Sequence, residues 1–534
     1  MFTLVGVAAA TLLALIQVTS GIEVTCGDLG RFDSGGDFYN VIHRPFPSVP
    51  VCALADEFCL RLTTRRNPEE VQILSADNTS TIRDSNFQPK KATKILIHGW
   101  LDKWNRPIWK AIASELLKEG DHNVIRLDWS EGNWFPYVQA AGNLRLVGAY
   151  AAKFVHHIVT VYKVNPKDIH IIGHSLGSHG AGYTGSFSQS VYNITVGRIT
   201  GLDPAGPYFT AMPESVRLDP SDAEVVDTMI TNGDKLLAMG SPDAMGHLNV
   251  WPNGGVNQPG CVPGLITTMM PLTQTIFSLP GTSAFSVDRS NPFDILTGFF
   301  ALQHSLSVKS NLVRNLVLNV IDHTGCSHVR ALQLFRDSID SSVCNTKAYE
   351  CDSYASFLQP DSECAQCNRS SVPSCTPWGY HTNLSLSLGG IRQRNFYTAT
   401  TARSPYCSKP KIQFTLQALP AETTSGKVYV TLYGSHATSS KLLLTPRNVD
   451  LKAGQTYSFF PQLSRELGTL EKLVFYWESS RLALLDRVKP DRIHLEGSIL
   501  ATDQDGTVTV FQPARTDVES RKNLPTKFLR SYEQ

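Results

Sequence analysis

Residues 93–230 alternate between short apolar runs and longer segments whose apolar residues recur every three or four positions. The short runs predict buried strands, and the longer segments predict amphipathic helices. The predicted strands are Thr93–His98, Asn123–Asp128, Asp168–Gly173, Val196–Leu202 and Glu224–Ile230, and the predicted helices are Pro107–Lys118 and Ala140–Tyr162. Strands that alternate with helices indicate an α/β fold with a mostly parallel sheet, whose functional side chains collect at the carboxyl ends of the strands.

The pattern changes near residue 390. From Lys411 onward, apolar and polar residues alternate with a period of two in the runs Ile412–Leu416, Val428–Leu432 and Leu473–Trp477. Turn residues separate these runs, and the pattern predicts an all-β sandwich. We place the boundary between Gly390 and Pro410, which gives a first domain over residues 21–395 and a second over 396–534.

The first twenty residues predict a signal peptide. Phe2–Val18 is apolar, the small residues Thr19 and Ser20 follow it, and the chain then turns polar. The apolar run is short for a membrane anchor, which is the alternative interpretation. We therefore expect the mature chain to begin near residue 21.

Composition and charge narrow the class of protein. The 534 residues carry a formal net charge of +1, with acids and bases mixed along the chain. A nucleic-acid-binding protein would show a basic stripe, so we expect no nucleic-acid partner. Eleven cysteines fit an oxidising compartment. The pair Cys364 and Cys367 lacks the second Cys or His pair that a zinc site needs. Four glycosylation sequons agree with a secreted, extracellular protein, at Asn78, Asn193, Asn368 and Asn383.

The segment Gly173-His174-Ser175-Leu176-Gly177 carries the strongest chemical signal. It follows the apolar strand Ile169–Ile172 and precedes a helix-compatible stretch of small residues. This is the G-x-S-x-G nucleophile elbow, a tight turn between a strand and a helix. The two glycines allow backbones to approach so closely that a Cβ at either position would clash. The pattern predicts that Ser175 is a nucleophile.

A serine nucleophile needs a base, and the base needs an acid that fixes its tautomer. In α/β hydrolases the acid follows the serine along the chain, and the histidine comes last. Asp203 stands at the carboxyl end of the next predicted strand and is our candidate for the acid. The alternative is that Asp203 only caps a turn before Pro204.

Four histidines could supply the base. His247 lies on a predicted strand and is assigned to the fold, while His304 lies inside an apolar stretch. His323 and His328 flank Cys326, and composition leaves the two nearly equal. We choose His328, because a disulfide at Cys326 would anchor its loop and a helix-like segment follows.

An oxyanion hole requires two backbone N–H groups that point at the developing negative charge. One should come from Leu176, which directly follows the nucleophile. The other should come from the loop after an early strand, where Gly99 allows a close approach and Trp100 offers its N–H. Trp100 could equally be an ordinary packed aromatic residue, and the two roles are compatible because the donor is the backbone.

Several motifs in one order resemble the pancreatic-type lipase family, which includes pancreatic, lipoprotein and hepatic lipases and related phospholipases A1. The motifs are H-G-W-L-D, G-H-S-L-G-S-H-G-A-G, R-I-T-G-L-D-P-A-G-P, R-L-D-P-S-D-A and G-H-L-N-V-W-P-N-G-G-x-x-Q-P-G-C. The resemblance covers nearly the whole mature chain. It implies an α/β-hydrolase fold followed by a PLAT-type β-sandwich, a triad of Ser175, Asp203 and His328, and oxyanion donors at Trp100 and Leu176. The resemblance settles the choice of His328 over His323.

The resemblance also implies a structural calcium ion. The segment Glu214–Asp222 matches the calcium loop of the family. The implied ligands are the backbone carbonyls of Glu214 and Arg217 and the carboxylates of Asp219 and Asp222, which are hard oxygen donors. Without the resemblance these acids would be interpreted as a solvated turn.

The family closes a lid loop with a disulfide, and the matching cysteines here are Cys261 and Cys326. They enclose 64 residues, so the implied lid insertion over residues 262–325 is much longer than in the family. The insertion is apolar, and a separate structural insertion is the alternative interpretation. Family spacing also implies the pairs Cys351–Cys364 and Cys367–Cys375. Five cysteines remain, so at least one thiol is free or joins another chain: Cys26, Cys52, Cys59, Cys344 and Cys407.

The sequence therefore predicts a secreted serine carboxyl-ester hydrolase that acts on glycerolipids, most consistent with a triacylglycerol lipase. A phospholipase A1 or galactolipid hydrolase is the alternative within enzymes. A lipid-binding or yolk-type protein that has lost catalysis is the alternative outside them. The implied partners are the surfaces of lipid droplets, micelles or lipoproteins, and a colipase-like activator.

Overall fold

The computed structural model describes residues 21–134, 136–234, 238–261 and 325–342, and then residues 346–530 with several gaps. Its contacts divide the chain into two compact units. The first comprises the chain up to Asn249 together with Gly255–Arg336 and Ser387–Arg394. The second comprises Val250–Gly254, Asp337–Leu386 and the chain from Asn395 onward. The predicted domain boundary at residue 395 stays a prediction.

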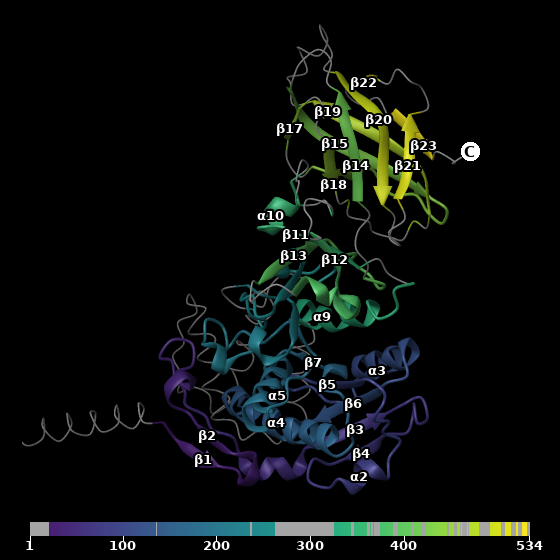
Figure 1. The fold of residues 1–534 in the computed structure, drawn as a ribbon. Helices are drawn as coiled ribbons and strands as arrows, with labels where there is room; N and C mark the ends of the chain where they lie inside the picture. Colours follow the sequence, from purple (N-terminus) through teal and green to yellow (C-terminus); the bar gives the residue numbers. More distant parts are fainter. Residues whose placement is uncertain are drawn as a thin grey trace, which may run out of the picture. The chain divides into compact units, whose positions relative to one another are not determined.

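The first unit is built on a mostly parallel sheet (Figure 1). Its strands run in the order β9-β8-β7-β5-β6-β3-β4, and β10 lies beside β9. Neighbours are parallel from β9 to β6, whereas β3 is antiparallel to both β6 and β4. The strands are β3 (Cys59–Thr63), β4 (Gln72–Leu74), β5 (Thr93–Ile97), β6 (Asn123–Asp128), β7 (Ile169–His174), β8 (Arg198–Leu202) and β9 (Val225–Met229), while β10 (Leu248–Pro252) begins in this unit and ends in the second.

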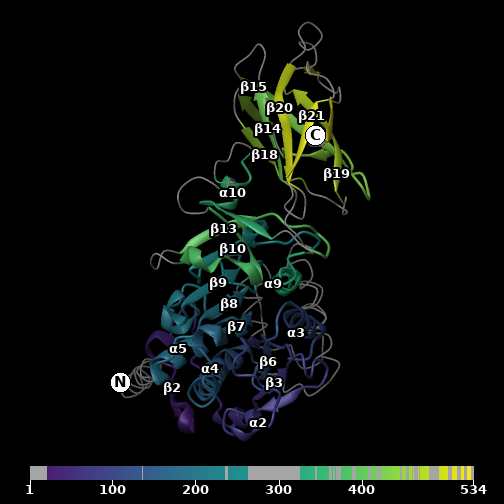
Figure 2. The same cartoon turned by 45° about the vertical axis from the view of Figure 1, so that its right-hand side comes forward.

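Helices cover both faces of this sheet (Figure 2). Their bounds are α2 (Ser80–Arg83), α3 (Pro107–Glu119), α4 (Tyr137–Thr160), α5 (Leu176–Tyr192) and α9 (Cys326–Asp337). The apolar faces of α4 and α5 pack on side chains of β5, β6 and β7 in one continuous core, while α3 contacts β6. Burial of apolar surface in this core is the main contribution to the folding free energy, and it fixes the positions of the strand ends.

The strands and helices predicted for this region are confirmed, with ends that differ by at most three residues. The largest difference is at α4, which begins at Tyr137 instead of Ala140. Pro136 directly precedes this helix and has an extended backbone conformation, so it is the N-cap residue. The helix ends at Thr160, before Asn165 and Pro166 start a short 3₁₀ turn. None of the described helices is long and apolar enough to span a membrane.

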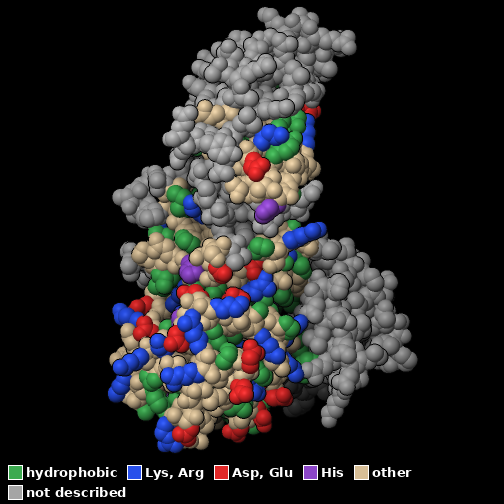
Figure 3. All heavy atoms as spheres, turned by 90° about the vertical axis from the view of Figure 1, so that its right-hand side faces the viewer, with side chains coloured by type: hydrophobic (Ala, Val, Ile, Leu, Met, Phe, Trp, Pro, Cys, Tyr) green, Lys and Arg blue, Asp and Glu red, His purple; other side chains and the backbone are tan. Residues whose placement is uncertain are grey.

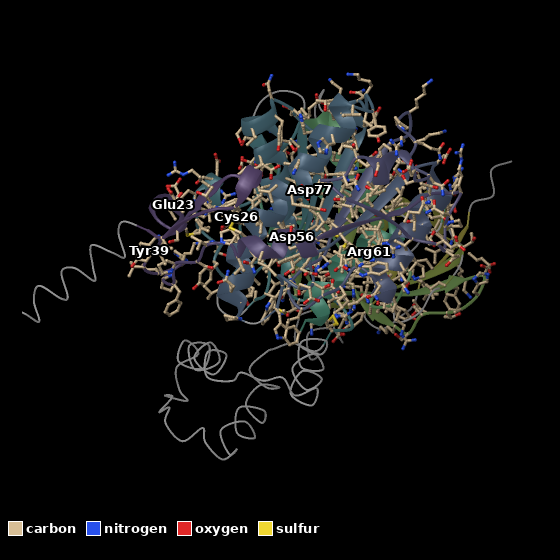
Figure 4. The ribbon with its side chains drawn as sticks, turned by 90° about the horizontal axis from the view of Figure 1, so that it is seen from below. Glu23, Cys26, Tyr39, Asp56, Arg61 and Asp77 are labelled. Atoms are coloured by element: carbon tan, nitrogen blue, oxygen red, sulfur yellow. A yellow bond between two sulfur atoms is a disulfide. The ribbon has the colours of Figure 1, made fainter. Side chains whose placement is uncertain are left out.

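The N-terminal segment forms a hairpin of β1 (Glu23–Thr25) and β2 (Arg31–Asp33). A disulfide between Cys26 and Cys52 ties it to a 3₁₀ helix, Cys52–Glu57 (Figure 4). Of the five cysteines left over by the sequence, two are therefore paired, and Cys59 is a free thiol. Cys344 and Cys407 lie outside the described residues.

The second unit contains a β-sandwich, as predicted. Its sheet runs in the order β16-β15-β19-β23-β21-β20-β14-β18, with β17 beside β15 and β22 beside β20. Its core consists of inward side chains such as Val428, Val430, Leu473, Phe475 and Trp477. The strands are β14 (Lys411–Gln417), β15 (Thr423–Gly434), β16 (Leu442–Leu443), β17 (Val449–Lys452), β18 (Thr456–Phe459), β19 (Leu470–Ser479), β20 (Arg492–Thr502), β21 (Val508–Pro513), β22 (Glu519–Arg521) and β23 (Thr526–Arg530).

The second unit also holds β11 (Lys347–Glu350), β12 (Cys375–Pro377), β13 (Arg394–Thr398) and the short helix α10 (Tyr354–Phe357). Strand β11 is antiparallel to both β12 and β13. The disulfides Cys351–Cys364 and Cys367–Cys375 lie in this region, in the pairing that the family spacing implied.

Three predictions concern residues outside the described ones. They are the signal peptide over residues 1–20, the lid insertion up to residue 324, and the glycosylation site at Asn368. The other three sequon asparagines, Asn78, Asn193 and Asn383, are exposed. Acidic and basic side chains alternate over the described part of the face in Figure 3.

Candidate active site

Ser175 occupies a strained turn between β7 and α5. Its φ of 58° and ψ of −125° lie outside the regions that a residue with a side chain normally adopts. A Cβ on Gly173 would lie 2.1 Å from the carbonyl oxygen of Gly177, and a Cβ on Gly177 would lie 2.1 Å from that of Ile97. Only glycine fits at either position, so this sequence forms the elbow that holds the Ser175 hydroxyl at the end of the strand.

Asp203 follows β8 and is fully buried, with a φ of 45°. Its backbone N–H donates to the carbonyl of Met229 at 2.7 Å. Its carboxylate oxygen Oδ1 accepts hydrogen bonds from the backbone N–H groups of Thr231 and Asn232 at 2.7 and 2.9 Å. These donors hold the carboxylate in one orientation and leave Oδ2 for another partner.

That partner is His328, on the first turn of α9. Its Nδ1–H donates to Oδ2 of Asp203 at 2.6 Å. The bond fixes the imidazole tautomer, so that Nε2 is the nitrogen that can accept a proton. Among the described residues, the buried Nε2 of His328 has no hydrogen-bond partner.

His174 precedes Ser175 and supports His328. Its Nε2–H donates to the backbone carbonyl of His328 at 3.1 Å, and the two ring centroids are 4.6 Å apart. Burial lowers the pKa of His174 far below its ordinary value, and the neighbouring His328 lowers it further. His174 therefore stays neutral, and a proton taken up by His328 meets no second positive charge at this contact.

The start of α9 is anchored to the loop after β10. The disulfide between Cys261 and Cys326 joins the two segments. The hydroxyl of Ser327 accepts a hydrogen bond from the backbone N–H of Gln258 at 3.0 Å, and the Gln258 amide donates to the carbonyl of Thr231 at 3.0 Å. Gln258 thus connects the helix of His328 to the loop that holds Asp203.

The two predicted oxyanion donors belong to segments next to the nucleophile. Leu176 is the first residue of α5, where the N–H groups of a helix have no intrahelical acceptor. Trp100 follows Gly99, and a Cβ on Gly99 would lie 2.8 Å from Cβ of Ser175 and 3.3 Å from its Oγ. The Gly99–Trp100 segment therefore packs directly against the nucleophile.

Two other histidines belong to the fold. Nδ1 of His247 accepts a hydrogen bond from the backbone N–H of Val226 at 3.0 Å, so His247 supports β9. His179 donates from Nε2 to the carbonyl of Ala205 at 3.0 Å and accepts at Nδ1 from the N–H of Leu218 at 3.1 Å. Burial lowers the pKa of His179 to about 3, so it joins these loops as a neutral group.

The segment implied to bind calcium is compatible with a cation. Asp219 and Asp222 are both buried, and their carboxylates accept hydrogen bonds from backbone N–H groups within the turn. Burial and the nearby Asp219 raise the pKa of Asp222 well above its ordinary value, so the ionised form of this carboxyl is costly unless a cation lies beside it. The Arg217 guanidinium donates to the backbone carbonyls of Met212 and Leu218.

The donor set is hard oxygen, as calcium prefers. The described residues contain no cluster of three or more His, Cys, Asp or Glu side chains that could hold a metal. A calcium ion here would therefore need backbone carbonyls, such as those of Glu214 and Arg217, beside the two carboxylates.

Sequence reasoning missed the residues that surround the carboxylate of Asp203. Gly240 is the clearest case: it must lack a side chain, because a Cβ there would lie 2.6 Å from Oδ2 of Asp203. The supporting N–H groups of Thr231 and Asn232 were also missed, since backbone donors leave no trace in residue type. The only signal in the sequence was the glycine itself, since a glycine in a loop can mark a close approach of another group.

A mostly parallel sheet, a strained serine between a strand and a helix, and a buried carboxylate bonded to a histidine together define the α/β-hydrolase class. Comparison with known sequences gives the family. The model of the Lipase family matches residues 22–274 and 307–406, and the model of the PLAT/LH2 domain matches residues 412–522. The chain belongs to the Lipase family. The interruption, residues 275–306, falls inside the predicted lid insertion.

Relatives cover most of the chain. Pancreatic triacylglycerol lipase of Myocastor coypus is 31% identical, over 87% of this chain and 90% of its own. Human pancreatic triacylglycerol lipase is 29% identical, over 92% and 94% of the two chains. A human protein described as inactive pancreatic lipase-related protein 1 is 30% identical, over 88% and 89%.

Proposed function

We propose that this protein is a triacylglycerol lipase in which Ser175, His328 and Asp203 form the catalytic triad. The observation that carries the proposal is the 2.6 Å hydrogen bond between His328 and the buried Asp203, beside a serine held in the elbow. The relatives named as pancreatic triacylglycerol lipases support the substrate class.

This triad would act as follows. His328 takes the hydroxyl proton of Ser175 at Nε2, and the serine oxygen attacks the ester carbonyl. The N–H groups of Trp100 and Leu176 stabilise the resulting oxyanion. His328 then gives the proton to the leaving glycerol oxygen, and Asp203 stabilises the imidazolium throughout. Water then attacks the acyl-enzyme: His328 takes its proton and returns it to the Ser175 oxygen as the acyl–oxygen bond breaks, which releases the fatty acid.

Other parts of the chain support action at a lipid surface outside the cell. The apolar insertion over residues 262–325 would act as a lid that opens on lipid droplets, micelles or lipoproteins. The PLAT/LH2 match suggests that the second domain takes part in docking, with or without a colipase-like activator. The disulfides and the predicted signal peptide favour secretion.

We also propose a structural calcium ion in the Glu214–Asp222 turn. It would be held by the carboxylates of Asp219 and Asp222 and by backbone carbonyls of Glu214 and Arg217. Its positive charge would offset the buried carboxylates and stabilise the turn against α5. No step of ester hydrolysis depends on it.

The second candidate is a lipid-binding protein without catalysis. It is favoured by the similarity to the relative described as inactive. Against it, the candidate nucleophile, base and acid are all present in this chain, with the base bonded to the acid.

Fatty-acid release from emulsified triolein and from phosphatidylcholine vesicles tests the proposal, with wild type beside Ser175→Ala. Release that needs Ser175 and occurs mainly from triolein supports the lipase. Release mainly from phosphatidylcholine moves the assignment to a phospholipase A1. Equal release by wild type and Ser175→Ala contradicts the proposed triad, and no release from either substrate favours the lipid-binding protein.

A further inference from the structure

Asn133 lies in the loop after β6 and is 1% exposed. Its Nδ2 donates to the backbone carbonyls of Gly99 and Asp102, each at 2.8 Å. Its own backbone carbonyl accepts a hydrogen bond from the N–H of Leu101 at 3.2 Å. One buried asparagine thus bonds to three residues of the loop that carries Trp100.

The amide orientation of Asn133 follows from its surroundings. Nδ2 has three close neighbours, of which the carbonyl oxygens of Gly99 and Asp102 can only accept, so the nitrogen must face them; the third, Nδ1 of His98, lies 3.3 Å away. The Gly99 carbonyl also contacts Nδ1 of His98 at 3.2 Å. Nε2 of His98 accepts from the N–H of Trp129 at 3.3 Å, which places the imidazole hydrogen on Nδ1, so that His98 and the N–H of Asp102, at 3.4 Å, are further donors to the Gly99 carbonyl.

The bonded carbonyl belongs to the peptide unit that supplies the oxyanion donor. The C=O of Gly99 and the N–H of Trp100 share one planar trans peptide, in which the two groups point in opposite directions. Holding the Gly99 carbonyl toward Asn133 therefore holds the Trp100 N–H away from it. Rotation of this peptide by half a turn would place a carbonyl where the donor should be.

The loop cannot move away from the nucleophile without losing these bonds. The Cα of Gly99 faces Ser175 so closely that an added Cβ would lie 2.8 Å from Cβ of the serine. Leu101 has a φ of 55°, an uncommon conformation for a leucine, and its N–H is bonded to Asn133. The conformation of the loop is thus set on one side by Ser175 and on the other by Asn133.

We propose that Asn133 is a positioning residue that fixes the Gly99–Trp100 peptide with the Trp100 N–H directed at the oxyanion. The inference rests on the proposed hydrolase function. Asn133 acts through the peptide and does not contact the reacting atoms. The hole is then preformed, and its donor depends on a side-chain amide in the neighbouring loop.

The test replaces the donor while keeping its shape. Asn133→Asp is isosteric and, as a carboxylate, cannot donate to the Gly99 carbonyl, and Asn133→Ala removes the side chain at any pH. With p-nitrophenyl butyrate as a water-soluble ester, we expect kcat to fall by about tenfold to a hundredfold and KM to change by less than about twofold, because the donor acts in the transition state. The inhibition constant of an alkyl boronic acid, whose serine adduct carries the oxyanion, should rise in parallel.

Asn123→Ala is the matched control. Asn123 is also fully buried and donates to backbone carbonyls, of Gln88 and Lys91, but it lies at the opposite end of β6. Its variant should lose thermal stability and keep the kcat of the folded protein. An unchanged kcat in both Asn133 variants, or an equal fall in kcat in Asn123→Ala, would overturn the proposal.

A second readout does not depend on catalysis. In ¹⁵N-tryptophan-labelled protein that carries Ser175→Ala, the backbone amide resonance of Trp100 should shift on Asn133→Asp and stay in place on Asn123→Ala. If wild type shows no ester hydrolysis, the proposed function fails and this resonance alone decides the role of Asn133. A Trp100 resonance that does not move would then reject it.

Discussion

A Cβ added to Gly240 would lie 2.6 Å from Oδ2 of Asp203, the oxygen that accepts the hydrogen bond from His328. The bare Cα of Gly240 therefore leaves the space in which acid and base meet. Its backbone is held in place, because its N–H donates to the carbonyl of Asn232 at 3.2 Å. The methyl group of an alanine would have to push the carboxylate aside.

We expect Gly240→Ala to lower kcat by about a hundredfold, since a displacement of about 1 Å in a catalytic group has an effect of that size. Gly132→Ala is the control, because the nearest atom to its added Cβ is 3.4 Å away, an ordinary contact. Initial rates on tributyrin, corrected for the folded fraction, check the difference. Equal rates in the two variants would show that the acid site tolerates the methyl group.

Asp203 and Asp227 are both buried, but we expect replacement by Asn to affect catalysis at the first and stability at the second. Asp203→Asn keeps the shape of the acid but favours the wrong tautomer of His328, and should lower kcat by about 10⁴ with little change in stability. Asp227 forms a buried pair with Arg198, at 2.7 and 2.9 Å. Asp227→Asn should lower the free energy of unfolding by about 3–5 kcal/mol and leave the kcat of the folded enzyme near wild type.

Urea unfolding and steady-state rates on both variants separate these effects. If Asp203→Asn lost activity only because less of the protein is folded, the residue would be assigned to the fold instead of the reaction.

Much of this arrangement could be predicted from the sequence. The apolar runs and the turn residues that bound them predicted the strands that end just before Ser175 and Asp203, because a buried parallel strand needs a continuous apolar run. The choice between His323 and His328 could not be made from composition, since both flank Cys326. It came from the resemblance, and the structure places His328 on Asp203.

The residues that orient the site were harder to predict. Asn133 binds a backbone carbonyl, and Gly240 leaves room for the Asp203 carboxylate because it has no Cβ. Neither effect has a periodic or compositional signature. The calcium turn was similar, because its acids resemble a solvated turn until packing buries them. Glycines of α5 make that packing possible: a Cβ on Gly182 would lie 2.7 Å from Oδ2 of Asp222.

Calcium should stabilise the protein through this turn. Two buried carboxylates without a cation are costly, so we expect EGTA to lower the melting temperature of wild type and excess Ca²⁺ to restore it. Asp222→Asn removes one charge and one ligand, and its melting temperature should be independent of Ca²⁺. Differential scanning calorimetry at constant ionic strength measures both. A wild-type melting temperature that ignores EGTA and Ca²⁺ would reject the calcium site.

His179 should make stability depend on pH. In the folded chain its pKa is lowered from 6.5 to about 3 by burial, and the nearby guanidinium groups of Arg217 and Arg44 act in the same direction. The unfolded chain therefore binds a proton below pH 6.5 that the folded chain does not bind until about pH 3. Stability from this group is complete above pH 6.5 and is lost as the pH falls through that range.

The slope from His179 alone approaches about 1.4 kcal/mol per pH unit in the middle of the range. His179→Gln cannot take up the proton, so its free energy of unfolding should fall less steeply between pH 6.5 and 4 than that of wild type. His43→Gln, at an exposed histidine, is the control and should keep the wild-type slope. Urea unfolding at half-unit pH steps measures the three slopes, and identical slopes in wild type and His179→Gln would show that the buried imidazole is protonated in the folded chain.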